Sequence, residues 1–409
     1  MLQVRSSVVG ALAAGAALVI SASPAGASDC ANTSTGLVPL TSLGGGLYLG
    51  QYQGGLYANG SNFMPTGHAS AGLFRGLSVI PRNTAGAPDP KGSYVLLSIG
   101  MSNTTMEFCS GSPQGCAPFS FIGKAANDPQ VDHANLVILD GASGGQTAGT
   151  WDDPADPNYD RVRDQVLAPE GLAEPQVAAL WIKVANANPT ISLPNPGADA
   201  FTLLSQLGNI ARAVHVRYPN VRQAFLSSRI YAGYASTPLN PEPYAYESAF
   251  AVKWLVQAQI TQMQTGRIDP LAGNLDPEGP DAVAPWLGWG PYIWADGLAP
   301  APGGLTWTCA DFNADGTHPA TSGREKVAER LLDFMLHSPW TKQWFLADPP
   351  VVGDLNGDGL VNGADLGLML GAAGPCPGPI PGVGTCAADL NGDGAVNGAD
   401  VGLLLGNWT

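Results

Sequence analysis

The sequence has little charge of either sign, and positive charge is the scarcer of the two. Charged residues make up 12% of the 409 residues, with 18 Lys and Arg against 33 Asp and Glu, and the net charge is -15. Nucleic-acid binding requires basic patches that neutralise phosphates. The composition therefore argues against nucleic acid as a partner, and no basic face suited to a membrane surface is found.

Long apolar runs are missing after the first 27 residues. Arg5, the apolar run VVGALAAGAALVISA and the small residues ending at Ala27 are typical of a secretory signal peptide. The run is short and interrupted by Gly and Ser, which argues against a membrane anchor. We therefore expect residues 1–27 to be removed and the mature chain, beginning at Ser28, to be secreted.

No two of the six cysteines have CxxC spacing, which argues against a thiolate zinc site. An even number of cysteines in an exported chain instead indicates disulfides. The expected pairs are two that flank short Gly- and Pro-containing loops and a third left by elimination: Cys109–Cys116, Cys376–Cys386 and Cys30–Cys309.

Apolar runs alternate with helical patterns from residue 93 onward. The predicted buried strands are SYVLLSIG (93–100), NLVILD (135–140), VAALWIKV (177–184) and RQAFLSS (222–228), and amphipathic helices are predicted at 202–218 and 246–264. Strands that alternate with helices predict parallel βαβ units in a three-layer α/β/α sandwich. Functional sites in such sheets collect at the carboxyl ends of the strands.

The chain divides by composition into four parts. After the signal peptide, residues 28–92 are Gly-rich without a clear period, so an irregular N-terminal extension is expected. Residues 93–348 form the α/β domain. Residues 351–409 are a separate module with six aspartates and no Lys, Arg or Glu.

Only five histidines are present, and His318 stands three residues after Asp315 in DFNADGTHP. This spacing allows the carboxylate to bind Nδ1 and leaves the other ring nitrogen free to act as a base. A helix is predicted to follow, with Ser322 and Glu325 as a capping box. The remaining histidines are interpreted as ordinary polar positions: His68, His133, His215 and His337.

Ser102, in LLSIGMSNTT, is the candidate nucleophile at the end of the first predicted strand. Gly100 permits a tight turn there, and a helix beginning at Asn103 would direct free N–H groups toward an oxyanion. The segment is not a GxSxG elbow. Gly144 and Gly145, after the second strand, would let backbone N–H groups approach the same oxyanion.

These segments resemble the SGNH/GDSL hydrolase superfamily over about residues 93–340. IGMSN is similar to its first block, in the GxSN form of carbohydrate-ester hydrolases, and DGTHP is similar to its last block, DxxH. DGASGGQT stands where the oxyanion glycine of the family is expected. The resemblance implies a flavodoxin-like sheet and a Ser102–His318–Asp315 triad that attacks an ester carbonyl without a cofactor.

The segment LWIKVANAN stands where the third family block, GxND, is expected, but it lacks the Gly of that block. Asn186 is the candidate side-chain oxyanion donor and Lys183 is a competing polar group. For both residues the alternative is a position at a strand end that faces solvent.

The aromatic segment APWLGWGPYIWADG contains Trp286, Trp289, Tyr292 and Trp294. We expect these rings either to line a carbohydrate cleft or to pack in the core. Arg229 either contacts an anionic substrate or pairs structurally.

Two segments 35 residues apart repeat the pattern D-x-N-x-D-G-x-x-N-x-x-D. Hard oxygen ligands at loop positions 1, 3, 5, 7 and 12 suit Ca²⁺, position 7 contributing a backbone carbonyl. The expected ligands of the two sites are Asp354, Asn356, Asp358, Leu360 and Asp365, and Asp389, Asn391, Asp393, Ala395 and Asp400. The repeats resemble a dockerin, which implies a cohesin-type protein partner, with a structural role as the alternative.

Together these features predict a secreted serine esterase with a calcium-binding tail. The expected substrate is an acyl ester, such as the O-acetyl groups of extracellular carbohydrate. The alternative is a non-catalytic carbohydrate-binding or adhesion protein with the same fold, which the missing GxND block favours.

Overall fold

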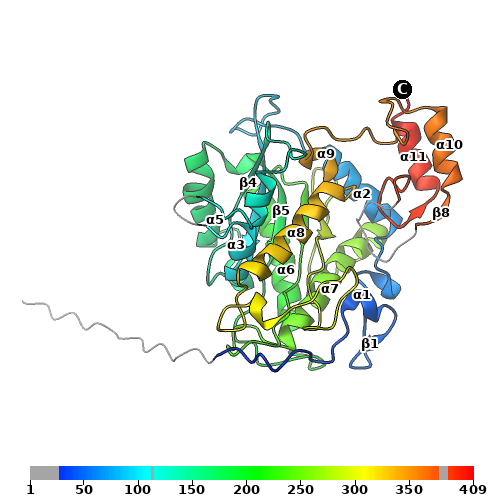
Figure 1. Cartoon of the computed structure of the whole chain (residues 1–409). Coiled ribbons are helices and arrows are strands. Elements are labelled where there is room, and N and C mark those ends of the chain that lie inside the picture. Colours follow the sequence, from blue (N-terminus) through cyan, green and yellow to red (C-terminus); the bar gives the residue numbers. More distant parts are fainter. Residues whose placement is uncertain (1–26, 112–114, 377–385) are drawn as a thin grey trace, which may run out of the picture.

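The computed structural model describes residues 27–111, 115–376 and 386–409 (Figure 1). Residues 1–26 of the predicted signal peptide lie outside this part of the chain. Within the described ranges, no helix combines the length and the apolar character needed to cross a membrane.

The chain folds into a sheet with helices on either side and a C-terminal tail. The strands are β1 (Leu47–Tyr48), β2 (Tyr52–Gln53), β3 (Tyr94–Gly100), β4 (Leu136–Leu139), β5 (Val177–Lys183), β6 (Gln223–Leu226), β7 (Trp286–Trp289), β8 (Gly374–Pro375) and β9 (Ala395–Val396). The α-helices are α1 (Leu40–Leu43), α2 (Thr66–Leu77), α3 (Ser102–Phe108), α4 (Phe121–Ala125), α5 (Pro157–Arg161), α6 (Asp199–Arg217), α7 (Tyr244–Thr265), α8 (Thr321–His337), α9 (Lys342–Phe345), α10 (Gly363–Gly371) and α11 (Gly398–Gly406).

The central sheet has five strands in the order β4-β3-β5-β6-β7, and every neighbouring pair is parallel. All residues of β3 and β5 are buried, as expected for strands covered on both faces. Helices α3, α4 and α8 pack together, and so do α6 and α7 (Figure 1). The predicted α/β fold with a parallel sheet is confirmed.

The aromatic segment supplies the fifth strand, which the sequence patterns did not predict. Trp286, Trp289 and Trp294 are buried, and Tyr292 packs against the core. The indole Nε1 of Trp289 donates to the carbonyl of Leu56 at 3.0 Å. Core packing, rather than a carbohydrate cleft, therefore accounts for these tryptophans.

The expected irregular extension contains a regular helix, α2, which corrects that prediction. Gly72 of α2 lies against the ring of Trp286, where an added Cβ would be 2.4 Å from Cζ2. His68 is also buried, with Nε2 2.8 Å from the carbonyl oxygen of Leu287. Burial lowers the pKa of His68 to about 4, so its interpretation as an ordinary polar position was wrong.

The predicted capping box of α8 is wrong. Helix α8 begins at Thr321 with Ala320 as its N-cap, and no side chain caps it. The Ser322 hydroxyl instead donates to Asp311 at 2.8 Å. All three predicted disulfides are present: Cys30–Cys309, Cys109–Cys116 and Cys376–Cys386.

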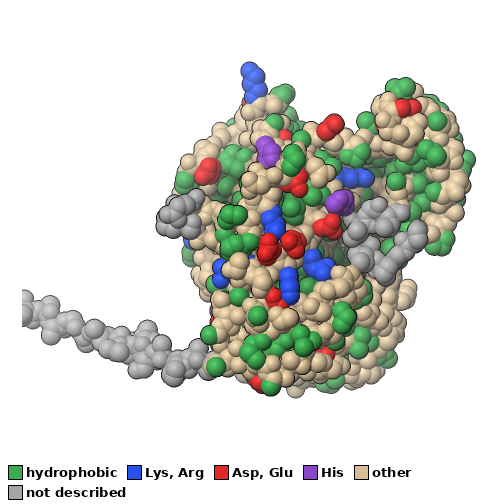
Figure 2. Space-filling view, in the orientation of Figure 1, with side chains coloured by type: hydrophobic (Ala, Val, Ile, Leu, Met, Phe, Trp, Pro, Cys, Tyr) green, Lys and Arg blue, Asp and Glu red, His purple; other side chains and the backbone are tan. Residues whose placement is uncertain are grey.

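Charge is distributed unevenly over the face shown in Figure 2. Acidic and basic side chains gather over α8, where Lys124 of α4 pairs with Glu325 and Glu329. The tail shows mostly uncharged and apolar side chains on this face (Figure 2). In the tail, α10 lies on the outer side of α11 (Figure 1), and the loop before α11 contacts α2 through Asn391 and Ser70.

Candidate active site

Ser102 is the first residue of α3 and follows directly on the carboxyl end of β3. Thr104 holds the turn: its hydroxyl accepts from the Met101 N–H at 3.3 Å and donates to the Lys183 carbonyl at 2.6 Å. Gly100 is required at this point, because a Cβ there would lie 2.3 Å from Thr104 Oγ1. The turn places Ser102 at the sheet edge where sites of this fold collect.

The three predicted triad residues meet in space. The Ser102 hydroxyl lies 2.8 Å from His318 Nε2, and Asp315 Oδ2 lies 2.5 Å from His318 Nδ1. Each side chain of the Asp315–His318 pair is about one-fifth exposed. Such a chain of contacts lets the imidazole take the hydroxyl proton while the carboxylate fixes the tautomer.

Asp315 is held as a charged group. Burial by itself would raise its pKa, but hydrogen bonds from the His318 ring, the His318 N–H and the Thr317 N–H outweigh this and lower the pKa. The two backbone N–H groups donate to Oδ1 at 3.0 Å each. The Asp-x-x-His spacing thus lets the turn donate backbone N–H groups to the carboxylate while the same carboxylate binds the imidazole ring.

The Asp315–His318 turn is fixed from two sides. Asn103 donates its amide to the Thr317 carbonyl at 3.1 Å, and the hydroxyls of Thr237 and Thr317 lie 2.6 Å apart. Gly316 has φ +64°, and a Cβ there would lie 1.9 Å from the Tyr234 carbonyl oxygen. These positioning residues were missed, because their partners come from distant parts of the chain.

The Gly144–Gly145 loop lies beside the end of β3. The Ser143 N–H donates to the Gly100 carbonyl at 3.2 Å. Both glycines are exposed, Gly145 has φ +79°, and an added Cβ would meet nothing within 4 Å at either. The loop is therefore open at both glycines.

Asp140, at the end of β4, ties this loop to the nucleophile strand and was also missed. Its carboxylate accepts from the hydroxyl of Ser98 at 2.5 Å, from the N–H of Ala142 at 3.2 Å and from the hydroxyl of Thr105. Burial raises the pKa of Asp140. The only available signal was its position as the last residue of the predicted strand NLVILD.

Asn186 and Lys183, the two candidates from the segment that departs from GxND, bind other side chains of the domain. Asn186 donates its amide to Gln206 at 2.8 Å and to Asp199 at 3.1 Å, both on α6. Lys183 is fully buried in an ion pair with Glu107. Neither is a free oxyanion donor in this structure, which corrects the assignment of Asn186.

Arg229 has the structural role that the sequence left as the second alternative. It is 2% exposed and out of reach of a substrate anion. Burial lowers the pKa of Arg229, and the negative charges of Glu107, Glu242 and Asp315 offset only part of this effect. The guanidinium is therefore a buried positive charge within a group of carboxylates.

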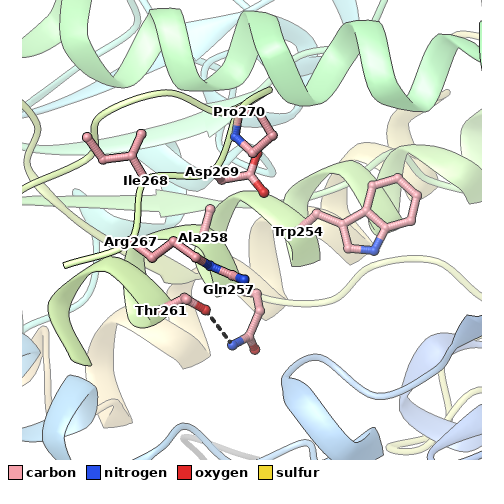
Figure 3. Close-up of a pocket in the computed structure, with 8 residues that line it drawn as sticks. All are labelled: Trp254, Gln257, Ala258, Thr261, Arg267, Ile268, Asp269 and Pro270. Atoms are coloured by element: carbon pink, nitrogen blue, oxygen red, sulfur yellow. Dashed lines mark hydrogen bonds between the residues drawn. The ribbon is translucent and has the colours of Figure 1, made fainter. Parts of the chain in front are cut away.

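A cavity of about 310 Å³ lies away from the triad, between the second half of α7 and the loop after it (Figure 3). Its lining is part aromatic and part polar: Trp254, Gln257, Ala258, Thr261, Arg267, Ile268, Asp269 and Pro270. None of the triad residues lines it, so it is not the reaction site.

The two acidic repeats adopt the same loop conformation. Asp354 accepts from the N–H groups of Gly357 and Gly359, and Asp389 accepts from the matching Gly392 and Gly394, all at 2.8 Å. The position-12 carboxylates of Asp365 and Asp400 accept backbone N–H groups from the start of their own loops.

The spacing of the oxygen-bearing residues in each loop is the spacing that a calcium loop requires. No group of three or more His, Cys, Asp or Glu side chains in the described residues is arranged to hold a metal ion. The three aspartates of each predicted ligand set therefore do not converge on one point in this structure, and the two calcium sites stay a prediction from the repeat pattern.

Residues 352–405 match the family model of the Dockerin type I domain. The tail therefore carries a dockerin type I domain, as the repeats indicated. By sequence, no curated protein matches the chain.

Several solved structures are similar to the α/β part. A family two carbohydrate esterase from Clostridium thermocellum, in complex with cellohexaose, is 13% identical with a TM-score of 0.32, and the match covers 61% of this chain and 66% of that one. An extracellular lipase from Streptomyces rimosus is 12% identical (TM-score 0.28; 58% and 100% covered). A mutant acetyl-xylooligosaccharide esterase from Geobacillus is 14% identical (TM-score 0.31; 59% and 94% covered).

Proposed function

We propose that the chain is a secreted serine esterase with Ser102 as nucleophile, His318 as general base and acid, and Asp315 as the residue that orients the imidazole. The observation that carries this proposal is the pair of contacts at His318, 2.8 Å to Ser102 and 2.5 Å to Asp315. Three residues from two distant segments meet in this arrangement at the carboxyl end of a parallel sheet, where such sites occur.

The reaction proceeds in two halves. Ser102 Oγ attacks the ester carbonyl while its proton moves to His318 Nε2, and collapse of the tetrahedral intermediate breaks the bond to the alcohol, which leaves with that proton. Water then repeats the sequence on the acyl-enzyme and releases the acid. The N–H groups of Ser102 and Gly145 are the proposed oxyanion donors, and no cofactor takes part.

The proposed substrate is an acyl ester, with O-acetyl groups on extracellular carbohydrate as the narrower assignment. The narrower assignment rests on the GxSN form of IGMSN, the signal-like N-terminus and the dockerin type I tail. The same tail supports binding to a cohesin-type protein and residence outside the cell.

Each acidic loop is proposed to bind one Ca²⁺. The ligands of the first site are Asp354, Asn356, Asp358, the Leu360 carbonyl and Asp365. Those of the second are Asp389, Asn391, Asp393, the Ala395 carbonyl and Asp400. Calcium would supply positive charge to a segment that has six aspartates and no basic residue.

Hydrolysis of p-nitrophenyl acetate by the wild type and by Ser102→Ala tests the esterase assignment. We expect the variant to lose at least about 10³-fold in rate, because the nucleophile is removed. Ser42→Ala, at an exposed serine of α1, is the matched control and should keep its activity.

One observation favours a second candidate, a carbohydrate-binding or adhesion protein without turnover. The Asn186 amide is engaged by α6, so the third oxyanion donor of the resemblance is missing. Equal hydrolysis rates in wild type and Ser102→Ala would favour this candidate over the esterase.

A further inference from the structure

The two metal loops have the same internal geometry but different surroundings. In the first loop Asn356, Asp358 and Gly359 are exposed. The matching residues of the second loop are buried, with Asn391 at 0% and Asp393 at 8% exposure. Since the internal hydrogen bonds match, the difference comes from what covers the second loop.

The glycines of the second loop contact the α/β domain. A Cβ on Gly394 would lie 2.2 Å from the ring of Phe63, and a Cβ on Gly392 would lie 2.5 Å from Pro339. At the equivalent positions of the first loop, Gly357 and Gly359, an added Cβ meets nothing within 4 Å. The second loop is thus packed at the distance that only glycine allows.

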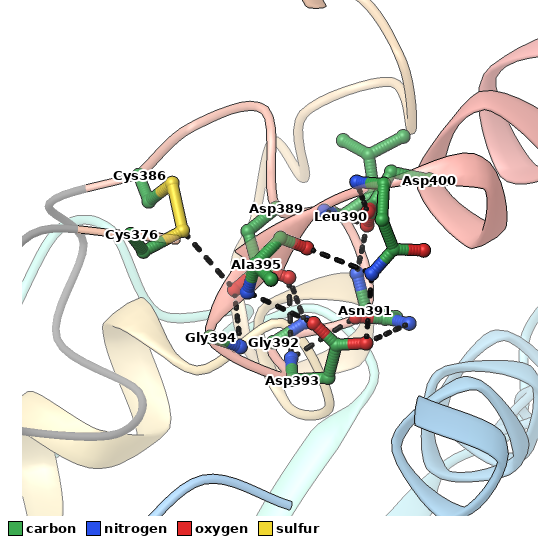
Figure 4. Close-up of a disulfide and its surroundings, with 11 residues drawn as sticks. Cys376, Cys386, Asp389, Leu390, Asn391, Gly392, Asp393, Gly394, Ala395 and Asp400 are labelled. Atoms are coloured by element: carbon green, nitrogen blue, oxygen red, sulfur yellow. Dashed lines mark hydrogen bonds between the residues drawn. A yellow bond between two sulfur atoms is a disulfide. The ribbon is translucent and has the colours of Figure 1, made fainter. Parts of the chain in front are cut away.

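Polar contacts accompany this packing. The amide of Asn391 contacts the hydroxyl of Ser70 on α2 at 3.1 Å. Lys342, at the start of α9, lies close enough to Asp389 for their charges to interact. Figure 4 shows the second loop, with the side chains of Asn391 and Asp393 facing each other and the Cys376–Cys386 disulfide beside Asp389.

The residues in contact with the domain are the proposed metal ligands or their immediate neighbours. Asn391 is a ligand at loop position 3 and also touches Ser70. Gly392 and Gly394 alternate with Asp393, which is the ligand at position 5. The conformation that a cation stabilises is therefore the one that fits against α2 and the α8–α9 turn.

We propose that the two repeats have different tasks, and that the second metal loop is an internal docking element that fastens the tail to the α/β domain. This inference rests on the proposed calcium sites. Calcium in the second loop stabilises the α/β domain through the contacts with Phe63, Ser70 and Pro339. Calcium in the first loop stabilises only the tail, whose first loop stays open to solvent.

Paired substitutions in the full-length protein test this coupling. Gly359→Ala and Gly394→Ala carry the same backbone strain, because the φ angles are +84° and +91°, but only the second collides with the domain. Differential scanning calorimetry with CaCl₂ and with EDTA measures the melting of the α/β domain. We expect calcium to raise this melting temperature by about 3 °C or more in the wild type and in Gly359→Ala, but not in Gly394→Ala.

A second pair of variants changes α2 instead of the tail, and only one of the two blocks the contact between α2 and the second metal loop. Ser70→Arg places a bulky side chain at the contact, whereas Thr66→Arg adds the same group at an exposed position of the same helix. Ser70→Arg should still bind two calcium ions in isothermal titration and yet lose the shift in domain melting. Thr66→Arg should keep both.

The outcomes separate the two proposals. If the protein binds two calcium ions but the melting shifts are equal in both members of each pair, the calcium sites are supported and the docking role of the second loop is overturned. No heat of calcium binding in the wild type would refute the metal loops and the coupling together.

Discussion

At the residue scale, the site depends on how Asp315 is held. Its carboxylate accepts from the imidazole and from two backbone N–H groups of the same turn. Because these hydrogen bonds lower its pKa despite burial, the group stays ionised at any pH at which an esterase normally works. An ionised carboxylate both orients His318 and stabilises the imidazolium that forms when Ser102 loses its proton.

Asp315→Asn should therefore keep the fold and lose the chemistry. Hydrolysis of p-nitrophenyl acetate is expected to fall by about 10³–10⁴-fold, because an amide favours the wrong tautomer of His318. A rate within a few-fold of the wild type would remove Asp315 from the mechanism.

The same variant predicts a pH dependence of stability. A carboxylate whose pKa is lowered on folding stabilises the fold above its unfolded pKa, which is about 4. That contribution is lost as the pH falls through the lower, folded pKa. Below about pH 5, the difference in melting temperature between wild type and Asp315→Asn should shrink as the pH falls. A difference that grows as the pH falls below about 5 would contradict the lowered pKa.

The residues that the sequence predicted are those with a local signal. Ser102 follows closely on an apolar strand, and Asp315 and His318 are three residues apart before a helix. Asn103 and Asp140 carry no such signal, because their partners, Thr317 and Thr105, lie in other segments. Asn186 was misassigned for the same reason, since nothing near it in sequence shows that α6 residues bind its amide.

At the scale of elements, the glycine loop after β4 is the part of the site that depends most on backbone conformation. Gly145 has φ +79°, in the left-handed region that favours glycine, whereas Gly144 is not in that region. An alanine in this region is strained by about 1–2 kcal/mol. The N–H groups of the loop would shift relative to the oxyanion if the strain were relieved.

Gly145→Ala should lower kcat by about tenfold or more with little change in KM, because an oxyanion donor acts mainly in the transition state. Gly144→Ala adds the same methyl group into the same open space without the positive φ, so a smaller fall in kcat is expected for this variant. Equal kcat values for the two variants would remove the loop from the oxyanion site.

The elements that were predicted and those that were missed differ in pattern. The strands that begin at Tyr94 and Val177 are long apolar runs, so their burial on both faces can be predicted from the sequence. Strand β7 is four residues long and contains two tryptophans, and a cleft lining was an equally good interpretation. Helix α2 packs through Gly72, Gly76 and other small residues, which leave no apolar stripe in the sequence.

At the scale of the whole molecule, an acidic tail is attached to a domain with its own core. Six aspartates without a basic residue repel one another, and two calcium ions would offset four of the six charges. Circular dichroism of residues 351–409 should show helix in CaCl₂ and lose much of it in EDTA. Identical spectra in the two conditions would contradict calcium-dependent folding of the tail.

The central claim is that Ser102 is an activated nucleophile in the intact protein. A fluorophosphonate probe followed by peptide mass spectrometry tests it most directly, since it reports the reacting atom without knowledge of the substrate. The account predicts one label per chain, on Ser102, absent in Ser102→Ala and formed much more slowly in Asp315→Asn. An unlabelled wild type, or a label that persists in Ser102→Ala, would contradict it.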